Sequence, residues 1–267
     1  MSSEKKILVI AGSDSCGGAG IQADIKTATA LQTYCSTAIT CLTNQNTQKV
    51  YNIHYTPTAF LSEQIKVLLD DINFDVIKIG MLGNQEIIDC VHKALLKKFK
   101  KIPIILDPVM VATSGDLLFD KSAINDLKLK LISKCFMVTP NIDEAKVLSG
   151  INIKNISDMR EAASEIKTNL GCKTVLVKGG HLNFTDGKIH NVFLDNDHKF
   201  HIISNKKINA KKLHGTGCTL ATAIACYLAK KPEKELWAVK KANNYVYEAV
   251  DNFLNVGKGS LVLQHWL

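Results

Sequence analysis

The chain has 267 residues, with 33 lysines and arginines against 25 aspartates and glutamates, and its formal net charge is +8. The hydrophobic content of 46% is ordinary for a globular protein and excludes an intrinsically disordered chain. Arg160 is the only arginine. Because base recognition favours the planar arginine fork, this composition disfavours a protein that reads nucleic-acid sequence, whereas polyanionic small molecules stay open as ligands.

Short apolar runs recur along the chain and are typical of buried strands. They occupy residues 7–11, 37–42, 76–79, 102–106, 136–138 and 174–177. Between them, apolar side chains at three- and four-residue spacing predict helices, for example over residues 60–72 and 87–99. Strands that alternate with helices predict an α/β fold, a mostly parallel sheet with helices on both faces.

The pattern changes near residue 190, where residues 191–194 and 199–203 flank Asp195, Asn196 and Asp197. This arrangement predicts an antiparallel hairpin at the edge of the sheet. No internal repeat and no linker rich in proline, glycine and serine interrupts the chain. We therefore predict a single domain over residues 1–267.

The longest apolar run, residues 221–229, is well below the roughly 20 residues that a membrane span needs. The eight cysteines are scattered, with no Cys-x-x-Cys pair. In a chain of this size such cysteines indicate reduced thiols and not a disulfide framework or a zinc site. We expect a cytoplasmic protein.

Small and polar residues directly follow each predicted strand. These clusters are residues 12–20, 44–46, 80–81, 107–108, 139–141 and 178–181. Turns after strands are often polar, so one such cluster alone carries little weight. In open parallel sheets, however, ligands bind beyond the carboxyl ends of the strands. Six clusters together predict a site at that edge.

The strongest single motif is HGTGCT, at residues 214–219, which precedes a helical stretch. Gly215 and Gly217 let the backbone approach a ligand closely, and free N–H groups at a helix start bind anions. A plain glycine-containing loop with a helix cap explains the motif equally well. The two standard nucleotide fingerprints are missing, since there is no Gly-x-x-x-x-Gly-Lys-Ser/Thr and position 220 is leucine.

Cys218 lies in the first turn of that predicted helix. Helix N-termini lower the pKa of a thiol, so we expect a thiolate near neutral pH that accepts the proton of an attacking substrate hydroxyl. The alternative is a small buried side chain packed beneath the loop, which is our interpretation of Cys226.

Asn141 and Glu144 follow Pro140 and share one face of a starting helix. With Asp107 at another strand end, they suit a hydrated Mg²⁺, which uses few carboxylates and keeps several waters. Helix capping by Asn141 with Glu144 as its partner, and a turn cap by Asp107, are equally good explanations.

Eight motifs of the sequence resemble those of the hydroxymethylpyrimidine/phosphomethylpyrimidine kinases of thiamine biosynthesis. The matching motifs are AGSD (11–14), GGAGIQAD (17–24), NQNT (44–47), KIGML (78–82), LDPVM (106–110), TPNIDEA (139–145), VKGGH (177–181) and HGTGCTL (214–220). The resemblance implies a ribokinase-like three-layer α/β/α fold and a homodimer. It also implies ATP-dependent phosphorylation of 4-amino-5-hydroxymethyl-2-methylpyrimidine to its monophosphate and then to the diphosphate.

The same resemblance implies roles for residues on the pyrimidine side of the site. Asp24 and Gln45 would hydrogen-bond the aminopyrimidine edge, and Met81 and Gly12 would pack against the ring. An amide and a carboxylate together complement an amino group beside a ring nitrogen.

On the phosphate side, the resemblance implies that Cys218 is the catalytic base and that Gly215, Thr216 and Gly217 form the anion hole. Lys178 and Thr216 would contact the ATP phosphates. The residues implied to support Mg²⁺ are the three already considered, Asp107, Asn141 and Glu144.

The sequence departs from the family at Ser15–Cys16, where Pro-Ser is usual, and at Lys49, where a glycine is common. Residues 256–267 match only loosely, and we assign them no role.

Two alternatives stay open. A pyridoxal or pyridoxine kinase would act on another ring that bears a hydroxymethyl group. A non-catalytic nucleotide- or nucleic-acid-binding protein would use lysine runs such as Lys97, Lys98, Lys100 and Lys101, or Lys206, Lys207, Lys211 and Lys212. We favour the interpretation that these lysines are simply solvated.

Overall fold

The computed structural model describes residues 4–110, 121–210 and 212–267. Within these ranges the α-helices are α1 (Gly20–Ala30), α2 (Thr58–Asp71), α3 (Gln85–Leu95), α4 (Lys121–Asp126), α5 (Ile142–Ser149), α6 (Ile156–Leu170), α7 (Thr216–Lys230) and α8 (Glu235–Asp251). A π-helical turn, η1 (Leu127–Leu131), and a 3-10 turn, η2 (Ile132–Lys134), follow α4.

The strands form one large sheet and one small one. The large sheet has the order β3-β2-β1-β4-β5-β6-β7-β8-β9, and the small one pairs β10 with β11. The strands are β1 (Lys6–Asp14), β2 (Tyr34–Gln45), β3 (Val50–Tyr55), β4 (Val76–Ile79), β5 (Ile104–Leu106), β6 (Met137–Val138), β7 (Thr174–Val177), β8 (Lys188–Leu194), β9 (Phe200–Lys206), β10 (Leu213–His214) and β11 (Leu261–Val262).

The central part of the large sheet, from β2 to β7, is parallel, and both edges are antiparallel. Strand β3 pairs antiparallel with β2 at one edge, and β8 and β9 form the hairpin at the other edge. The hairpin and the mostly parallel sheet are as the sequence predicts. Strand β3 was not predicted.

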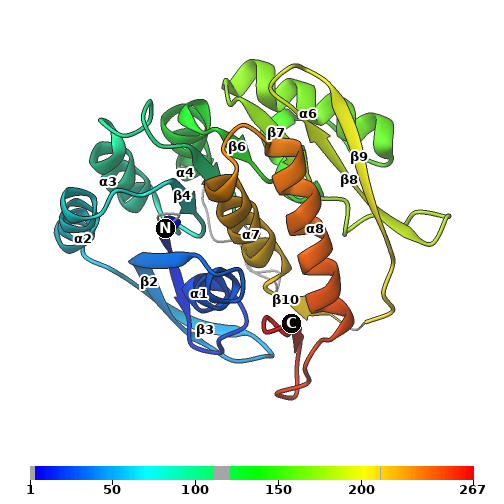
Figure 1. Cartoon of the computed structure of the whole chain (residues 1–267), viewed down its shortest axis with the longest axis horizontal. Coiled ribbons are helices and arrows are strands. Elements are labelled where there is room, and N and C mark those ends of the chain that lie inside the picture. Colours follow the sequence, from blue (N-terminus) through cyan, green and yellow to red (C-terminus); the bar gives the residue numbers. More distant parts are fainter. Residues whose placement is uncertain (1–3, 111–120, 211) are drawn as a thin grey trace.

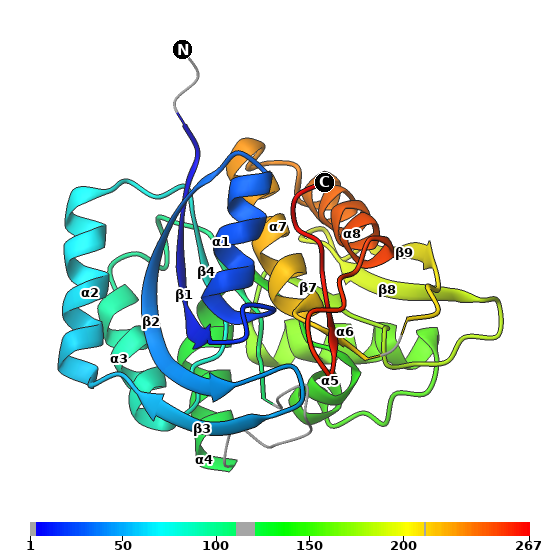
Figure 2. The same cartoon turned by 90° about the horizontal axis from the view of Figure 1, so that it is seen from below.

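Helices cover both faces of the sheet, as Figures 1 and 2 show. Along β1, Leu8 and Ile10 join the core beneath α2, α3, α5 and α6, whereas Ile7 and Val9 join the core beneath α1, α7 and α8. This alternation is the two-residue period of a strand that is buried on both faces. It confirms the three-layer α/β/α architecture.

The apolar run at 221–229 lies in α7, where it is buried between the sheet and α8. Among the residues that the structure describes, no helix has both the length and the apolar content needed to cross a bilayer.

Candidate active site

A cavity of about 870 Å³ lies beyond the carboxyl ends of the parallel strands. Every site residue predicted from the sequence lines it except Asp24. Those residues are Gly12, Gln45, Met81, Asp107, Asn141, Glu144, Lys178, Gly215, Thr216, Gly217 and Cys218. The sheet topology therefore brings together residues that lie up to 206 positions apart in the sequence, from Gly12 to Cys218.

The start of α7 forms one wall of the cavity. Gly215 caps the helix with φ at 90°, and a Cβ there would come within 1.8 Å of the Gly18 carbonyl oxygen. A Cβ on Gly217 would meet Lys178 Nζ at 3.1 Å and Asp107 Oδ2 at 3.2 Å. Glycine is thus required at 215 by conformation and by space, and at 217 it brings the backbone close to a lysine ammonium. No side chain caps the helix, so its first N–H groups suit an anion.

Cys218 follows in the first turn of α7 and lines the same cavity. Burial raises the pKa of its thiol to about 11, Lys78 acts in the opposite direction, and Asp24 and Asp107 raise it further. The expected thiolate near neutral pH is therefore wrong for the protein alone, because burial and two carboxylates outweigh the helix start.

Asp24 on α1 does not line the cavity. Its two carboxylate oxygens each lie 2.9 Å from Lys78 Nζ on β4, and Thr222 Oγ1 donates to Oδ1 at 2.6 Å. Both members of the ion pair have fully buried side chains. The carboxylate is thus engaged inside the protein and does not face the cavity, where the resemblance places it as a substrate contact.

Lys78 is a functional candidate that the sequence interpretation missed. Burial alone would lower the pKa of Lys78, but Asp24 outweighs burial and raises it, so the ammonium stays charged. Its charge lowers the pKa of the Cys218 thiol, although Lys78 does not line the cavity. The sequence holds one signal for this ion pair: Lys78 lies inside the apolar run VIKI, at residues 76–79. A lysine is almost never fully buried without a partner, so its position in a buried strand indicates a buried carboxylate nearby.

A second ion pair joins the ends of β5 and β7. Lys178 Nζ lies 2.6 Å from Asp107 Oδ1, and Thr139 Oγ1 donates to the same oxygen at 3.2 Å. Burial alone would lower the pKa of Lys178, but Asp107 and Glu144 raise it. The ammonium therefore lies charged beside the N-terminus of α7, where it favours an anion.

Asn141 and Glu144 form the capping box at the start of α5. Asn141 Oδ1 accepts from the Glu144 N–H at 2.9 Å, and Glu144 Oε2 accepts from the Asn141 N–H at 2.7 Å. Burial raises the pKa of Glu144 to about 7, Lys178 opposes this, and Asp107 adds to it. The capping explanation is confirmed, and it leaves both side chains on the cavity wall.

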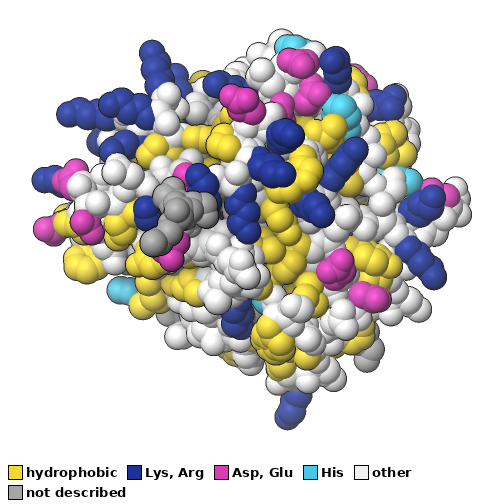
Figure 3. Space-filling model, viewed as in Figure 1, with side chains coloured by type: hydrophobic (Ala, Val, Ile, Leu, Met, Phe, Trp, Pro, Cys, Tyr) yellow, Lys and Arg dark blue, Asp and Glu magenta, His cyan; other side chains and the backbone are white. Residues whose placement is uncertain are grey.

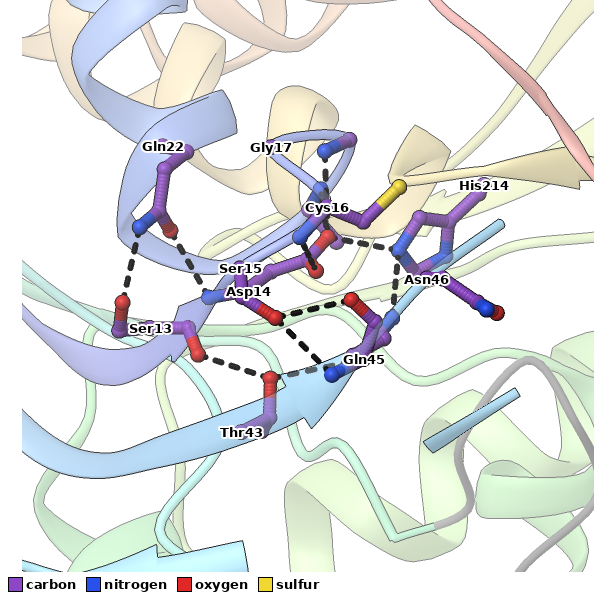
Figure 4. A network of polar contacts seen from close by, with 12 residues as sticks. Ser13, Asp14, Ser15, Cys16, Gly17, Gln22, Thr43, Gln45, Asn46 and His214 are labelled. Carbon is purple, nitrogen blue, oxygen red and sulfur yellow. Dashed lines mark hydrogen bonds and ion pairs between the residues drawn. The ribbon is translucent and has the colours of Figure 1, made fainter. Parts of the chain in front are cut away.

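A polar network connects the first loop with β2 and β10 (Figure 4). Asp14 accepts from the N–H groups of Cys16, Gly18 and Ala19, and its Oδ2 lies 2.8 Å from His214 Nε2. Burial alone would raise the pKa of Asp14, but His214 and these N–H groups outweigh it and lower the pKa. The network fixes the loop that follows β1, the strand that carries Gly12.

The same network accommodates the departures from the family. Ser15 Oγ donates to the Gln45 carbonyl at 2.8 Å and accepts from the Gln45 N–H at 2.9 Å, so it anchors the end of β2. Asn46 Oδ1 closes the following turn by accepting from the N–H groups of Gln48 and Lys49. The φ of Lys49 is not positive, so this turn does not require a glycine at that position.

Part of the lysine run near residue 210 faces the cavity. Lys206, Lys207 and Lys212 line it, and Lys211 lies outside the described residues. On the face shown in Figure 3, lysine and arginine side chains gather at the upper left and near the centre of the view. Lys206, Lys207 and Lys212 are all exposed, as expected of solvated lysines, and they also border the cavity.

The sequence model of the family described as phosphomethylpyrimidine kinase matches residues 14–264. The chain is 39% identical over 267 residues to the hydroxymethylpyrimidine/phosphomethylpyrimidine kinase of Haemophilus influenzae. The aligned region covers all of this chain and 98% of that protein. It is 43% identical to the thiamine biosynthesis bifunctional protein ThiED of Geobacter sulfurreducens, over 98% of this chain and 52% of that one. The chain spans about half the length of the bifunctional relatives that it matches.

The fold is similar to that of the pyridoxal kinase from Staphylococcus aureus in complex with ADP. The TM-score is 0.89 at 31% sequence identity, over 99% of this chain and 94% of the other. The H. influenzae kinase and the S. aureus pyridoxal kinase each match nearly the whole of this chain, including the residues that line the cavity.

Proposed function

The chain belongs to the phosphomethylpyrimidine kinase family, and from this premise we propose that it phosphorylates 4-amino-5-hydroxymethyl-2-methylpyrimidine with ATP and then converts the monophosphate to the diphosphate, in thiamine biosynthesis. One observation carries the proposal. The glycine loop at the start of α7, the Cys218 thiol and the Gln45 amide line one cavity. It therefore offers an anion site, a proton acceptor and a group for the ring edge together.

In the first transfer, the substrate hydroxyl oxygen forms a bond to the γ-phosphorus and the bond to the β–γ bridging oxygen breaks, which releases ADP. The hydroxyl proton passes to the sulfur of Cys218 in its thiolate form. The Lys78 ammonium, which lowers the pKa of this thiol, stabilises that form. The N–H groups of Gly215, Thr216 and Gly217 would receive the negative charge of the transferred group.

In the second transfer, the acceptor is an oxygen of the monophosphate. A phosphate monoester loses its second proton with a pKa of about 6, so this oxygen is already ionised at neutral pH. The step needs no general base. Cys218 should therefore matter for the first transfer and much less for the second.

ATP fits the positively charged side of the cavity. Lys178 lies beside the helix start, and Lys206, Lys207 and Lys212 line the wall. The S. aureus neighbour is described as a complex with ADP, which supports the proposal that this chain binds a nucleotide.

The donor set fits Mg²⁺ held largely through water. Asp107 and Glu144 supply buried carboxylates on the cavity wall, and Asn141 supplies an amide oxygen. Bound there, Mg²⁺ would neutralise charge on the ATP phosphate oxygens.

A pyridoxal kinase is the second candidate, because the fold overlaps a pyridoxal kinase over nearly its full length. Gln45 favours the aminopyrimidine, since an amide complements an amino group beside a ring nitrogen. The comparisons favour a kinase over a non-catalytic nucleic-acid-binding protein. We also propose a cytoplasmic homodimer, and light scattering of the purified protein tests the dimer.

The deciding experiment measures ATP turnover with the two ring substrates at equal concentration and resolves their products. The proposal expects the aminopyrimidine to be phosphorylated faster and to give both mono- and diphosphate. Faster turnover of pyridoxal would favour the second candidate. Salt-sensitive duplex binding without ATP turnover would favour a non-catalytic protein.

A further inference from the structure

His214 Nε2 faces two side chains at once. It lies 2.8 Å from Asp14 Oδ2 and 2.9 Å from the nitrogen of the Gln45 side-chain amide. Asp14 already accepts three backbone N–H groups, so its carboxylate acts as an acceptor. His214 Nε2 must therefore carry a hydrogen and donate it. An amide nitrogen, itself a donor, does not match this position.

The other end of the same amide gives an independent result. Thr43 Oγ1 lies 3.0 Å from the Ser13 carbonyl oxygen and 3.3 Å from the Gln45 amide oxygen. The single hydroxyl hydrogen of Thr43 satisfies the Ser13 carbonyl. Thr43 Oγ1 can then only accept from Gln45, and an amide oxygen does not match this position either.

One rotation resolves both conflicts. Turning the Gln45 amide by 180° exchanges the positions of its oxygen and nitrogen. The oxygen then shares the one Nε2 hydrogen of His214 with Asp14 Oδ2, and the nitrogen donates to Thr43. One lone pair and one N–H of the amide remain for a ligand.

We propose that His214, held by Asp14, is a positioning residue that fixes the orientation of the Gln45 amide and thereby selects the aminopyrimidine ring. This inference rests on the proposed function. The remaining lone pair and N–H complement an amino N–H beside a ring nitrogen. Pyridoxal has no amino group beside its ring nitrogen, so the fixed orientation discriminates between the two rings.

The protonation of His214 can be measured without any turnover. Long-range ¹H–¹⁵N spectra of the full-length protein distinguish the ring nitrogens, with His214→Gln used to assign the signal. We expect a hydrogen on Nε2. An Nε2 without a hydrogen would overturn the proposal even if the kinase activity is as proposed.

A double-mutant cycle tests the consequence. We expect His214→Phe and Gln45→Ala each to lower kcat/KM for the aminopyrimidine by about 10- to 100-fold, the range for a buried polar group left unsatisfied. The double variant should resemble Gln45→Ala alone, because His214 acts through Gln45. His214→Gln, which keeps a donor N–H, should recover part of the loss. Losses that multiply in the double variant would contradict the proposal.

The control is His201→Phe, which removes another histidine paired with a carboxylate, Asp195, at 2.7 Å. His201 does not line the cavity, so the kcat/KM of the His201→Phe variant for the aminopyrimidine should stay at the wild-type value. Thermal unfolding of each variant separates misfolding from a local effect. If wild-type protein fails to phosphorylate the aminopyrimidine, the proposed function fails, whereas the spectra still test the His214 contact by themselves.

Discussion

Cys218→Ala should separate the two phosphoryl transfers. At pH 7.5 a thiol with a pKa of about 11 is ionised in about one molecule in 3,000, and ionising it costs about 5 kcal/mol. A positioned general base is typically worth about 10²- to 10⁴-fold in rate. We therefore expect Cys218→Ala to lower kcat for the first transfer by that factor. The second transfer, whose acceptor oxygen is already ionised, should fall by less than about tenfold.

The assay starts separately from the hydroxymethylpyrimidine and from its monophosphate, and follows each product by chromatography. In the wild type, kcat for the first transfer should rise with pH between 7 and 10 as the thiol ionises, and Cys218→Ala should abolish this rise. Cys226→Ala is the matched control, because Cys226 lies on the same helix, is buried and does not line the cavity. Equal losses in both transfers, or a flat wild-type profile for the first, would refute the base role.

Three further predictions follow from the buried charges and the glycine loop. Lys78→Met should lower the free energy of unfolding, measured in urea, by about 3–5 kcal/mol, because it leaves Asp24 buried and unpaired. Adding Asp24→Leu to this variant should recover most of the loss. A double variant that recovers none of it would contradict the account. The raised pKa of Glu144 gives stability that is fully present below its unfolded value of about 4.5 and is lost as the pH rises through about 7. The change in unfolding free energy caused by Glu144→Gln should therefore be more favourable at pH 8 than at pH 5, by about 1–3 kcal/mol. An equal change at both pH values would contradict a raised pKa of Glu144. Gly215→Ala should abolish ATP turnover, since a Cβ there meets the Gly18 carbonyl at 1.8 Å, and a variant with normal KM for ATP would show that the loop is not the phosphate site.

The strands were predictable where short apolar runs end abruptly at turn residues. Strands β4 and β7 begin and end at the predicted residues, 76–79 and 174–177. Strand β3 was missed because it lies at an edge of the sheet and carries exposed side chains such as Tyr51. Without a buried face, the hydrophobic pattern of an edge strand is weak.

The position of the site was predictable, but its electrostatics were not. The cavity lies at the carboxyl ends of the strands because every parallel sheet gathers its loops there. The pairing of Asp24 with Lys78 depends on two elements meeting 54 positions apart, which local sequence does not encode. For the same reason, the prediction of a low thiol pKa at Cys218 used the helix start and could not include the burial that raises it.

The most direct measurement is ATP turnover by the wild-type protein with the hydroxymethylpyrimidine, in competition with pyridoxal and with product phosphates resolved. The account predicts preferential use of the pyrimidine and accumulation of its diphosphate. Preferential phosphorylation of pyridoxal, or no turnover of the pyrimidine, would contradict it.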